Sequence, residues 1–204
     1  MASINYAQKE IACKVVYYGP GMCGKTTNLL HLHRSIDAEM RGELVALATP
    51  GEKTLFFDFL PVSAANLYGF NTKFQLYTVP GQVTYNSTRR LVLRGVDGIV
   101  FVCDSQWDKL AENVESFLNL MENLSTYNHC LENVPFVIQF NKRDLPNAAP
   151  VDFINYLLKR PPVPQFEAVA TEGRGVFETL ECVCRYVLAG LRRHELVTAT
   201  AGGS

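Results

Sequence analysis

The sequence predicts an α/β fold in which helices cover both faces of a mostly parallel sheet. Strand-like and helix-like segments alternate along the chain, and repeated strand–helix units form such sheets through right-handed crossovers. Residues 96–104 are almost continuously apolar, as a strand buried on both faces requires. Hydrophobic residues make up 48% of the 204 residues, which is enough for the core of one domain. We expect that domain in residues 1–193 and a disordered tail in residues 194–204.

The first predicted strand covers residues 11–18, which are rich in β-branched and aromatic side chains and stop at Gly19. A helix is predicted from Thr26, because apolar residues recur at the spacing of one helical face: Leu29, Leu32 and Ile36. Residues 41–53 are mostly polar and contain glycine, so we expect a loop there.

A hairpin should follow this loop. Residues 54–60 are expected to pair with residues 72–79, and the first segment should form one antiparallel edge strand of the sheet. The buried strand at residues 96–104 comes next. Residues 135–140 and 166–170 supply two more, which gives a sheet of about six strands.

Three further helices are predicted at residues 110–124, 151–159 and 176–191. In the first of them, apolar side chains step by four and three along one face. We expect this whole stripe in the core: Leu110, Val114, Phe117, Met121 and Leu124.

The charge pattern excludes some classes of partner. The net charge is −1 with both signs interspersed, whereas nucleic-acid-binding domains usually carry a basic face. The pairs Arg89 with Arg90 and Arg192 with Arg193 are expected on solvated helix surfaces. The N-terminus lacks a signal-peptide pattern, and no apolar run approaches the ~18 residues of a membrane span. We expect a cytoplasmic protein, monomeric on its own, without direct membrane insertion.

Residues 19–26, Gly-Pro-Gly-Met-Cys-Gly-Lys-Thr, match the phosphate-binding pattern GxxxxGK[ST] between a predicted strand and a predicted helix. Glycines let successive backbone N–H groups and the helix N-terminus point at phosphates. Lys25 should reach the β- and γ-phosphates, and Thr26 should bind Mg²⁺. The expected nucleotide contacts in this loop are Gly19, Gly21, Met22, Cys23, Gly24, Lys25, Thr26 and Thr27.

A second motif, Asn-Lys-Arg-Asp at residues 141–144, indicates which base is bound. The Asp144 carboxylate can accept hydrogen bonds from guanine N1–H and the 2-amino group, whereas adenine lacks that amino group. Sites built around such pairs reject the wrong base strongly, because buried groups would stay unpaired. Asn141 should brace the loop, and the Lys142 stem should lie along the base. An adenine-using P-loop enzyme is therefore disfavoured.

These motifs and the domain size resemble the Ras superfamily of small GTPases, and more closely the bacterial MglA family of cell-polarity and gliding-motility GTPases. The resemblance runs from about residue 3 to residue 191 and is carried by residues 17–21, 53–61, 76–82, 94–102 and 141–146. It implies a P-loop small-GTPase fold with an extra strand near residues 3–10. It also implies a polarity switch that alternates between GTP and GDP, is recruited to a cell pole by partners and is activated by a Roadblock-type protein resembling MglB.

The same resemblance assigns further residues. Thr54 takes the position that binds Mg²⁺ and the γ-phosphate, and Gln82 takes that of the glutamine that orients the attacking water. Gly81 precedes this glutamine in the nucleotide-sensing turn, and Ala170 falls where a backbone N–H contacts guanine O6. Lys53 stands where the family carries an arginine, and an ammonium cannot bridge two oxygens as a guanidinium does. One alternative is therefore a nucleotide-bound scaffold that hydrolyses GTP very slowly.

Small GTPases usually carry an acid four residues before that glutamine, where this chain has Thr78. A threonine hydroxyl can accept a hydrogen bond from a metal-bound water but lacks the negative charge. Two acids are candidates to replace the missing one, Asp58 in an apolar strand and Asp104 at the end of another. Whether Thr78 or Asp58 supports Mg²⁺ is left open by the sequence.

Three aromatic residues in the predicted hairpin cannot all face one side of a strand: Phe56, Phe57 and Phe59. One of them must point away from the others. We expect either a hydrophobic switch surface for effectors and the activator, or burial of all three under helices.

Overall fold

The fold is taken from a computed structural model that describes residues 2–47, 57–67, 70–159 and 162–201. Only the backbone is described for residues 46–47, 57, 64–67, 83 and 192–201. Three sequence-predicted residues, Lys53, Thr54 and Phe56, lie outside the described ranges.

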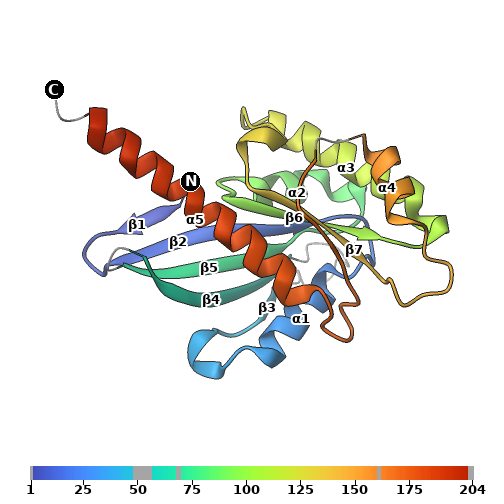
Figure 1. The fold of residues 1–204 in the computed structure, drawn as a ribbon, viewed down its shortest axis with the longest axis horizontal. Coiled ribbons are helices and arrows are strands. Elements are labelled where there is room, and N and C mark those ends of the chain that lie inside the picture. The colour runs from blue at the N-terminus through green and yellow to red at the C-terminus, as the bar shows by residue number, and fades with distance from the viewer. Residues whose placement is uncertain (1, 48–56, 68–69, 160–161, 202–204) are drawn as a thin grey trace.

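The described chain forms one eight-stranded sheet (Figure 1). The strand order across the sheet is β3-β4-β5-β2-β6-β7-β8, and β1 pairs with β2. The strands are β1 (Ser3–Asn5), β2 (Glu10–Tyr18), β3 (Val45–Leu47), β4 (Phe57–Leu67), β5 (Phe70–Thr78), β6 (Gly98–Asp104), β7 (Phe136–Asn141) and β8 (Gln165–Glu167). This confirms the predicted α/β class.

Strands β5, β2, β6, β7 and β8 run parallel, and β4 is antiparallel to β5 as predicted. The N-terminal strand implied by the family resemblance is also present, and β1 pairs with the start of β2. Farther along, residues Val15 to Tyr18 of β2 pair with β6. Because β5 pairs with the other flank of β2, β1 and β6 share one flank of β2 end to end.

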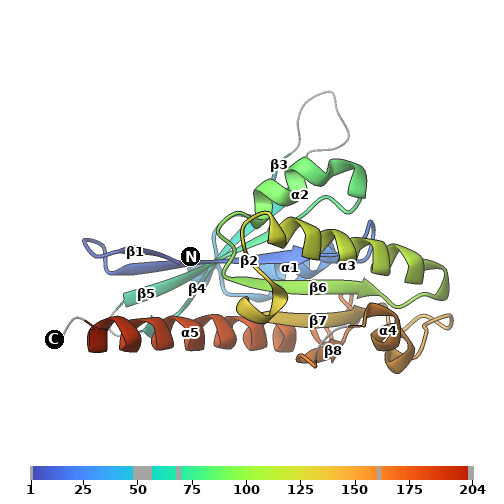
Figure 2. The same cartoon turned by 90° about the horizontal axis from the view of Figure 1, so that it is seen from above.

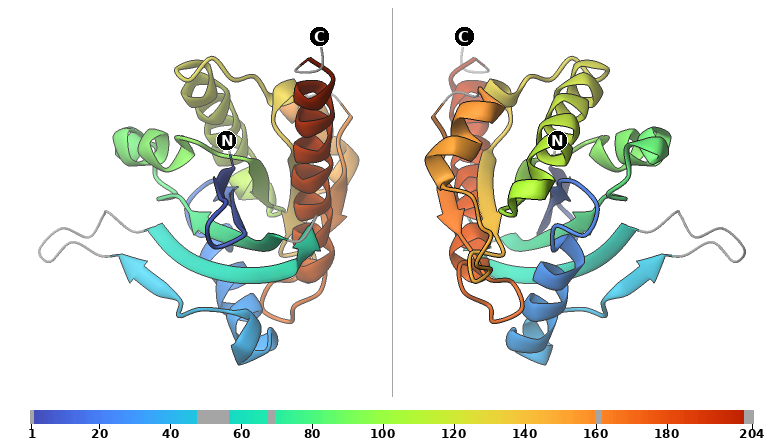
Figure 3. Two further views of the ribbon diagram at one scale, coloured as in Figure 1. Left: turned by 90° about the vertical axis from the view of Figure 1, so that its left-hand side faces the viewer. Right: turned by 90° about the vertical axis from the view of Figure 1, so that its right-hand side faces the viewer.

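The expected loop at residues 41–53 was wrong in part, because β3 lies inside it and makes β4 an inner strand. Val45 pairs with Phe59, and Leu47 with Phe57. A strand of three residues is too short to show the alternation of apolar and polar side chains. It forms because it pairs with β4, and a single sequence does not reveal this pairing. Figure 3 shows β4 curving along one side of the molecule with β3 beside it.

Helices cover the two faces of the sheet in separate groups (Figure 2). Their bounds are α1 (Lys25–Ser35), α2 (Asn86–Leu93), α3 (Leu110–Ser125), α4 (Val151–Leu158) and α5 (Val176–Ala201). Buried residues of α1 and α5 pack together on one face, and those of α2, α3 and α4 pack on the other. Helix α5 runs into the segment for which we expected disorder, where alanine, leucine and glutamate favour helix.

Two predictions about side chains on the α2–α4 face were wrong. Met121 is 38% exposed, while the core face of α3 is completed by Leu120 and by buried polar residues such as Asn123. Arg89 was expected in solvent but is completely buried in α2. The apolar pattern missed both because α2 and α3 meet through polar side chains.

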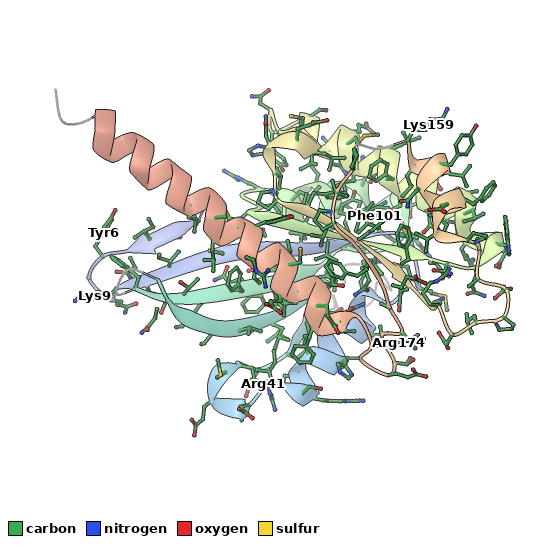
Figure 4. The ribbon with its side chains drawn as sticks, viewed as in Figure 1. Tyr6, Lys9, Arg41, Phe101, Lys159 and Arg174 are labelled. Carbon is green, nitrogen blue, oxygen red and sulfur yellow. The ribbon has the colours of Figure 1, made fainter. Side chains whose placement is uncertain are left out.

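The turn between β1 and β2 and the carboxyl ends of the parallel strands lie at opposite ends of the sheet. Figure 4 shows Tyr6 and Lys9 together at the turn between β1 and β2, far from Arg174 and Lys159. Phe101 lies between them in β6, within the buried core. The carboxyl ends of the parallel strands gather at the Arg174 side, where open α/β sheets bind ligands.

Candidate functional site

The loop between β2 and α1 closes tightly because two of its glycines cannot be replaced. Gly19 has φ 147°, and a Cβ there would lie 2.2 Å from the Val102 carbonyl oxygen. Gly24 has φ 103°, and a Cβ there would lie 2.1 Å from Asn141 Nδ2. Both side chains would clash and both backbone conformations favour glycine. The loop thus turns back on itself with its amides near the N-terminus of α1.

Lys25 lies inside this loop rather than in solvent, with 6% of its surface exposed. Its ammonium donates to the carbonyl oxygens of Gly19 at 3.0 Å and Pro20 at 2.5 Å. Burial lowers the pKa of Lys25, and burial raises the pKa of the Cys23 thiol next to it. Cys23 is therefore a buried thiol of low reactivity that packs inside the loop.

The predicted magnesium residue Thr26, at the start of α1, is hydrogen-bonded to Asp58 of β4. The Thr26 hydroxyl donates to Asp58 Oδ2 at 2.6 Å, and the Thr78 hydroxyl donates to the same oxygen at 3.0 Å. Thr78 Oγ1 in turn accepts from the Asp58 backbone N–H at 2.8 Å. The two candidates that the sequence left open therefore form one cluster, in which Thr78 fixes the carboxylate of Asp58 beside Thr26.

The other candidate acid, Asp104, is committed elsewhere. Its buried carboxylate accepts from Lys142 Nζ at 2.5 Å and from the Gln106 backbone N–H at 3.1 Å. These contacts do not favour Asp104 as the replacement for the missing acid. The sequence did not show the ion pair with Lys142, which joins a strand end to a loop 38 residues away.

Asn141 joins the phosphate loop to the loop after β8. Its side-chain amide donates to the Cys23 carbonyl at 2.8 Å, and its amide oxygen accepts from the Ala170 N–H at 2.9 Å. This is the bracing role that the sequence predicted for Asn141. Lys142 has φ 65°, which turns its side chain toward Asp104 and Gln106.

A cavity of about 280 Å³ opens at this junction. Its lining residues are Met22, Gly24, Thr27, Asn141, Lys142, Asp144, Leu145, Val169, Ala170 and Thr171. Asp144 is exposed at its rim, where a base could reach it. Seven of these residues were predicted from the sequence, Ala170 among them only through the family resemblance. Leu145, Val169 and Thr171 were missed, and their only signal is adjacency to the predicted residues.

The turn that follows β5 rests directly on the phosphate loop. A Cβ on Gly81 would lie 2.3 Å from Gly21 Cα and 2.9 Å from the Pro20 carbonyl carbon. Gln82, next in the chain, is exposed. Gly81 therefore permits a backbone contact that no other residue allows, and Gln82 borders that contact.

Of the three hairpin aromatics, the structure describes the side chain of Phe59. The Phe59 ring is half-buried, with its centroid 4.8 Å from that of Tyr77. The side chain of Phe57 is not described. No helix in the described residues is long and apolar enough to span a membrane.

A phosphate loop, a bracing asparagine and a base cavity at the carboxyl edge of a parallel sheet define a P-loop nucleotide-binding protein of the small-GTPase class. The chain matches the ADP-ribosylation factor family over residues 1–187. It is 51% identical to the mutual gliding-motility protein MglA of Myxococcus xanthus (strain DK1622) over 193 residues, which cover 95% of this chain and 99% of that protein.

A second similarity links the chain to a longer protein. It is 28% identical over 141 residues to the Ras and EF-hand domain-containing protein of Xenopus tropicalis, covering 69% of this chain but only 17% of that protein. The chain belongs to the ADP-ribosylation factor family of small GTPases. As such a protein it binds guanine nucleotide and hydrolyses GTP to GDP and phosphate.

Proposed function

We propose that this protein is a GTP-driven switch that controls cell polarity or gliding motility by binding partners only in its GTP state. The observation that carries the nucleotide assignment is Asn141, which holds the phosphate loop and the base cavity together. The similarity to MglA over nearly both full lengths supports the cellular role. We place the protein in the cytoplasm as a monomer that partners bring to a cell pole.

The residues of the site fit a magnesium-bound guanine nucleotide. Thr26 and Thr54 would hold Mg²⁺, and Asp58 with Thr78 would bind its water ligands. The described residues contain no group of three or more His, Cys, Asp or Glu side chains around a metal position. That absence suits Mg²⁺, which keeps several waters and binds few protein groups besides phosphates. When bound, it would neutralise charge on the β- and γ-phosphates.

The chain's own groups divide the remaining work. Lys25 would exchange its carbonyl partners for phosphate oxygens, since a buried ammonium needs acceptors. Asp144 would pair with the guanine edge, and the Ala170 N–H would contact O6. Gln82 would orient the attacking water.

We assign the activator and effector surface to the hairpin aromatics Phe56, Phe57 and Phe59. The half-exposed Phe59 supports this assignment, because a partly covered aromatic ring can move between a core and a partner. The activator would be a Roadblock-type protein resembling MglB.

The test of this function is direct. Nucleotide extracted from the purified protein should be guanine nucleotide, and GTP turnover should rise when a Roadblock-type partner is added. Preferential binding of ATP would exclude the guanine assignment. Unchanged turnover with such a partner would exclude the activator assignment while leaving the GTPase intact.

Lys53 favours a second possibility, a scaffold that scarcely hydrolyses GTP. Replacing Lys53 with arginine should raise the single-turnover rate, because a planar guanidinium can bridge transition-state oxygens. Arginine fingers contribute about 10³- to 10⁵-fold in related enzymes, so even a tenth of that effect is measurable. Lys53→Gln serves as the control for loss of charge. No acceleration in Lys53→Arg, alone or with the activator, would remove this explanation.

A further inference from the structure

Arg89 is a buried arginine with an incomplete set of partners. Its side chain has no solvent exposure. Nη2 donates to Ser116 Oγ at 2.6 Å, and the guanidinium carbon lies 4.3 Å from the centroid of the Tyr18 ring. Nε and Nη1 have no hydrogen-bond partner in the described part of the chain. A buried cation with two unused donors is energetically costly in this state, and such groups call for an explanation.

The surroundings of Arg89 do not offset this cost. No carboxylate forms an ion pair with it among the described residues, and the nearby acid Glu115 is exposed. Burial accordingly lowers the pKa of Arg89. Arginine keeps its charge in proteins, so the positive charge stays in place.

The polar groups around Arg89 are, by contrast, well satisfied. Tyr18 Oη donates to Asn119 at 2.7 Å and accepts from Asn123 at 3.0 Å. Asn119 and Asn123 both donate to Asn86, at 3.0 and 2.7 Å. These bonds connect the end of β2, just before the phosphate loop, with α2 and α3. Helix α2 therefore packs against α3 and the end of β2 through hydrogen bonds as well as through apolar contacts.

Arg89 lies close in the chain to the turn that borders the nucleotide site. Arg89 lies in the first turn of α2, and helical side chains point back toward the N-terminus. The turn that precedes this helix contains Gly81 and Gln82. Arg89 also lies over the ring of Tyr18, the last residue of β2 before the phosphate loop.

The same turn rests on the phosphate loop. Gly81 lies against the backbone of Gly21 and Pro20, within the loop whose N–H groups cradle phosphates in this motif. A γ-phosphate bound in that loop would therefore lie next to the turn. Displacement of this turn would carry its carbonyl oxygens past the start of α2. A guanidinium with free Nε and Nη1 is suited to capture them, since its donors form a rigid fork.

We propose that Arg89 is a positioning residue for GTP hydrolysis. In the GTP state its Nε and Nη1 bind backbone carbonyl oxygens of the turn at residues 79–85, and this holds Gln82 toward the γ-phosphate. The inference rests on the role proposed above for Gln82.

The test exploits the cost of the buried charge. Arg89→Met combined with Ser116→Ala removes both ends of the one hydrogen bond and keeps an apolar stem of similar length. We expect the GDP-loaded variant to melt about 2–4 °C higher than the wild type. Its single-turnover GTP hydrolysis should fall about 10- to 100-fold, because small errors in positioning cost that much. Its Kd for GTP should change less than threefold. Arg89→Lys should retain part of the rate.

Arg94→Met is the matched control, because Arg94 is exposed at the end of the same helix. It should leave both melting temperature and hydrolysis unchanged. A lower melting temperature for Arg89→Met with Ser116→Ala, at an unchanged rate, would assign Arg89 a purely structural role and overturn the proposal. A higher melting temperature at an unchanged rate would overturn it as well.

A cycle with Gln82→Ala separates this inference from the proposed function. If Gln82→Ala does not slow hydrolysis, the role of Gln82 fails, whatever Arg89 does. If Gln82→Ala slows hydrolysis and Arg89→Met does not, only the inference fails. If Arg89 acts through Gln82, the variant that combines Gln82→Ala with Arg89→Met should hydrolyse GTP no more slowly than Gln82→Ala alone. If the two residues act independently, the fold-losses in hydrolysis rate should multiply.

Discussion

At the scale of single residues, we propose that the carboxylate of Asp58 takes the role of the acid that most small GTPases carry at the position of Thr78. The Thr26 hydroxyl donates its hydrogen bond to Asp58 Oδ2, so the lone pairs of its oxygen stay available to a metal ion. The Thr78 hydroxyl donates a hydrogen bond to the same oxygen and accepts one from the backbone N–H of Asp58. In this proposal, Thr78 holds the Asp58 carboxylate in place.

This division of roles predicts a rescue. Asp58→Ala should raise the Mg²⁺ concentration needed to retain GTP about 10- to 100-fold, the usual effect of losing a residue that orients metal ligands. Asp58→Ala combined with Thr78→Asp should recover part of this loss, because the new carboxylate enters the same cluster. Thr78→Asp alone should be harmful, since two carboxylates would meet at a hydrogen-bond distance.

The measurement is the rate of GTP release as Mg²⁺ is titrated. Asp152→Ala, which removes an exposed acid on α4, is the control. An unchanged Mg²⁺ midpoint in Asp58→Ala would assign the metal support to other groups. A lack of rescue by Thr78→Asp would mean that Asp58 acts from a position residue 78 cannot reach.

The sequence predicted this cluster only as alternatives, for a physical reason. Thr26, Asp58 and Thr78 are far apart in the chain, and their meeting depends on the register of β4 against β5. Motif residues such as Lys25 and Asn141 were predictable because short loops fix their neighbours. Arg89 was not, because its burial depends on a polar helix interface that resembles a solvated surface in sequence.

At the scale of elements, α5 packs on β6 through a glycine. A Cβ on Gly98 would lie 2.7 Å from Val187 Cγ2 and 3.0 Å from Val183 Cγ2. Gly98 has an ordinary strand conformation, so its lack of a side chain serves helix–sheet packing. The sequence showed a strand here but could not show which residue admits the helix.

Gly98→Ala should therefore destabilise the fold by about 1–3 kcal/mol through overpacking. Val187→Ala should also destabilise it, by leaving a space in the core. The double variant should cost less than the sum of the two, because each change relieves the other. Urea unfolding of the four proteins measures the coupling. If the two losses in the free energy of unfolding simply add, residues 98 and 187 do not interact, and α5 must shift away from the new methyl group.

At the scale of the whole molecule, the layered architecture follows from the sequence because it depends on averages over many residues. Alternating strands and helices, and a strand apolar on both faces, require a sheet with two helical layers whatever the details. The structure differs from the prediction at the edge of the sheet and at the end of the last helix. Strand β3 exists through its pairing with β4, and the extension of α5 beyond residue 193 depends on local helix propensity.

The core between the sheet and α5 makes the stability of the whole fold sensitive to alkali. Burial raises the pKa of the Cys13 thiol to about 12, with a smaller contribution from Asp97. Burial likewise raises the pKa of Cys184 and Tyr17. Groups whose folded pKa is raised contribute stability that is complete below the unfolded pKa and is lost as pH rises toward the folded pKa.

The free energy of unfolding should consequently fall as the pH rises above about 9, where the thiols of the unfolded chain ionise and those of the folded chain do not. Cys13 alone should contribute a slope of about 1.4 kcal/mol per pH unit between pH 9 and pH 12. Lys25 opposes this trend, because its lowered pKa makes the folded state gain stability up to the unfolded pKa of lysine.

The measurement is urea unfolding under reducing conditions at pH 8, 9.5 and 10.5. The free energy of unfolding should decline less steeply with pH in Cys13→Ala than in Cys130→Ala, which removes an exposed thiol. Parallel declines for the two variants would mean that Cys13 ionises as readily in the folded protein as in the unfolded chain.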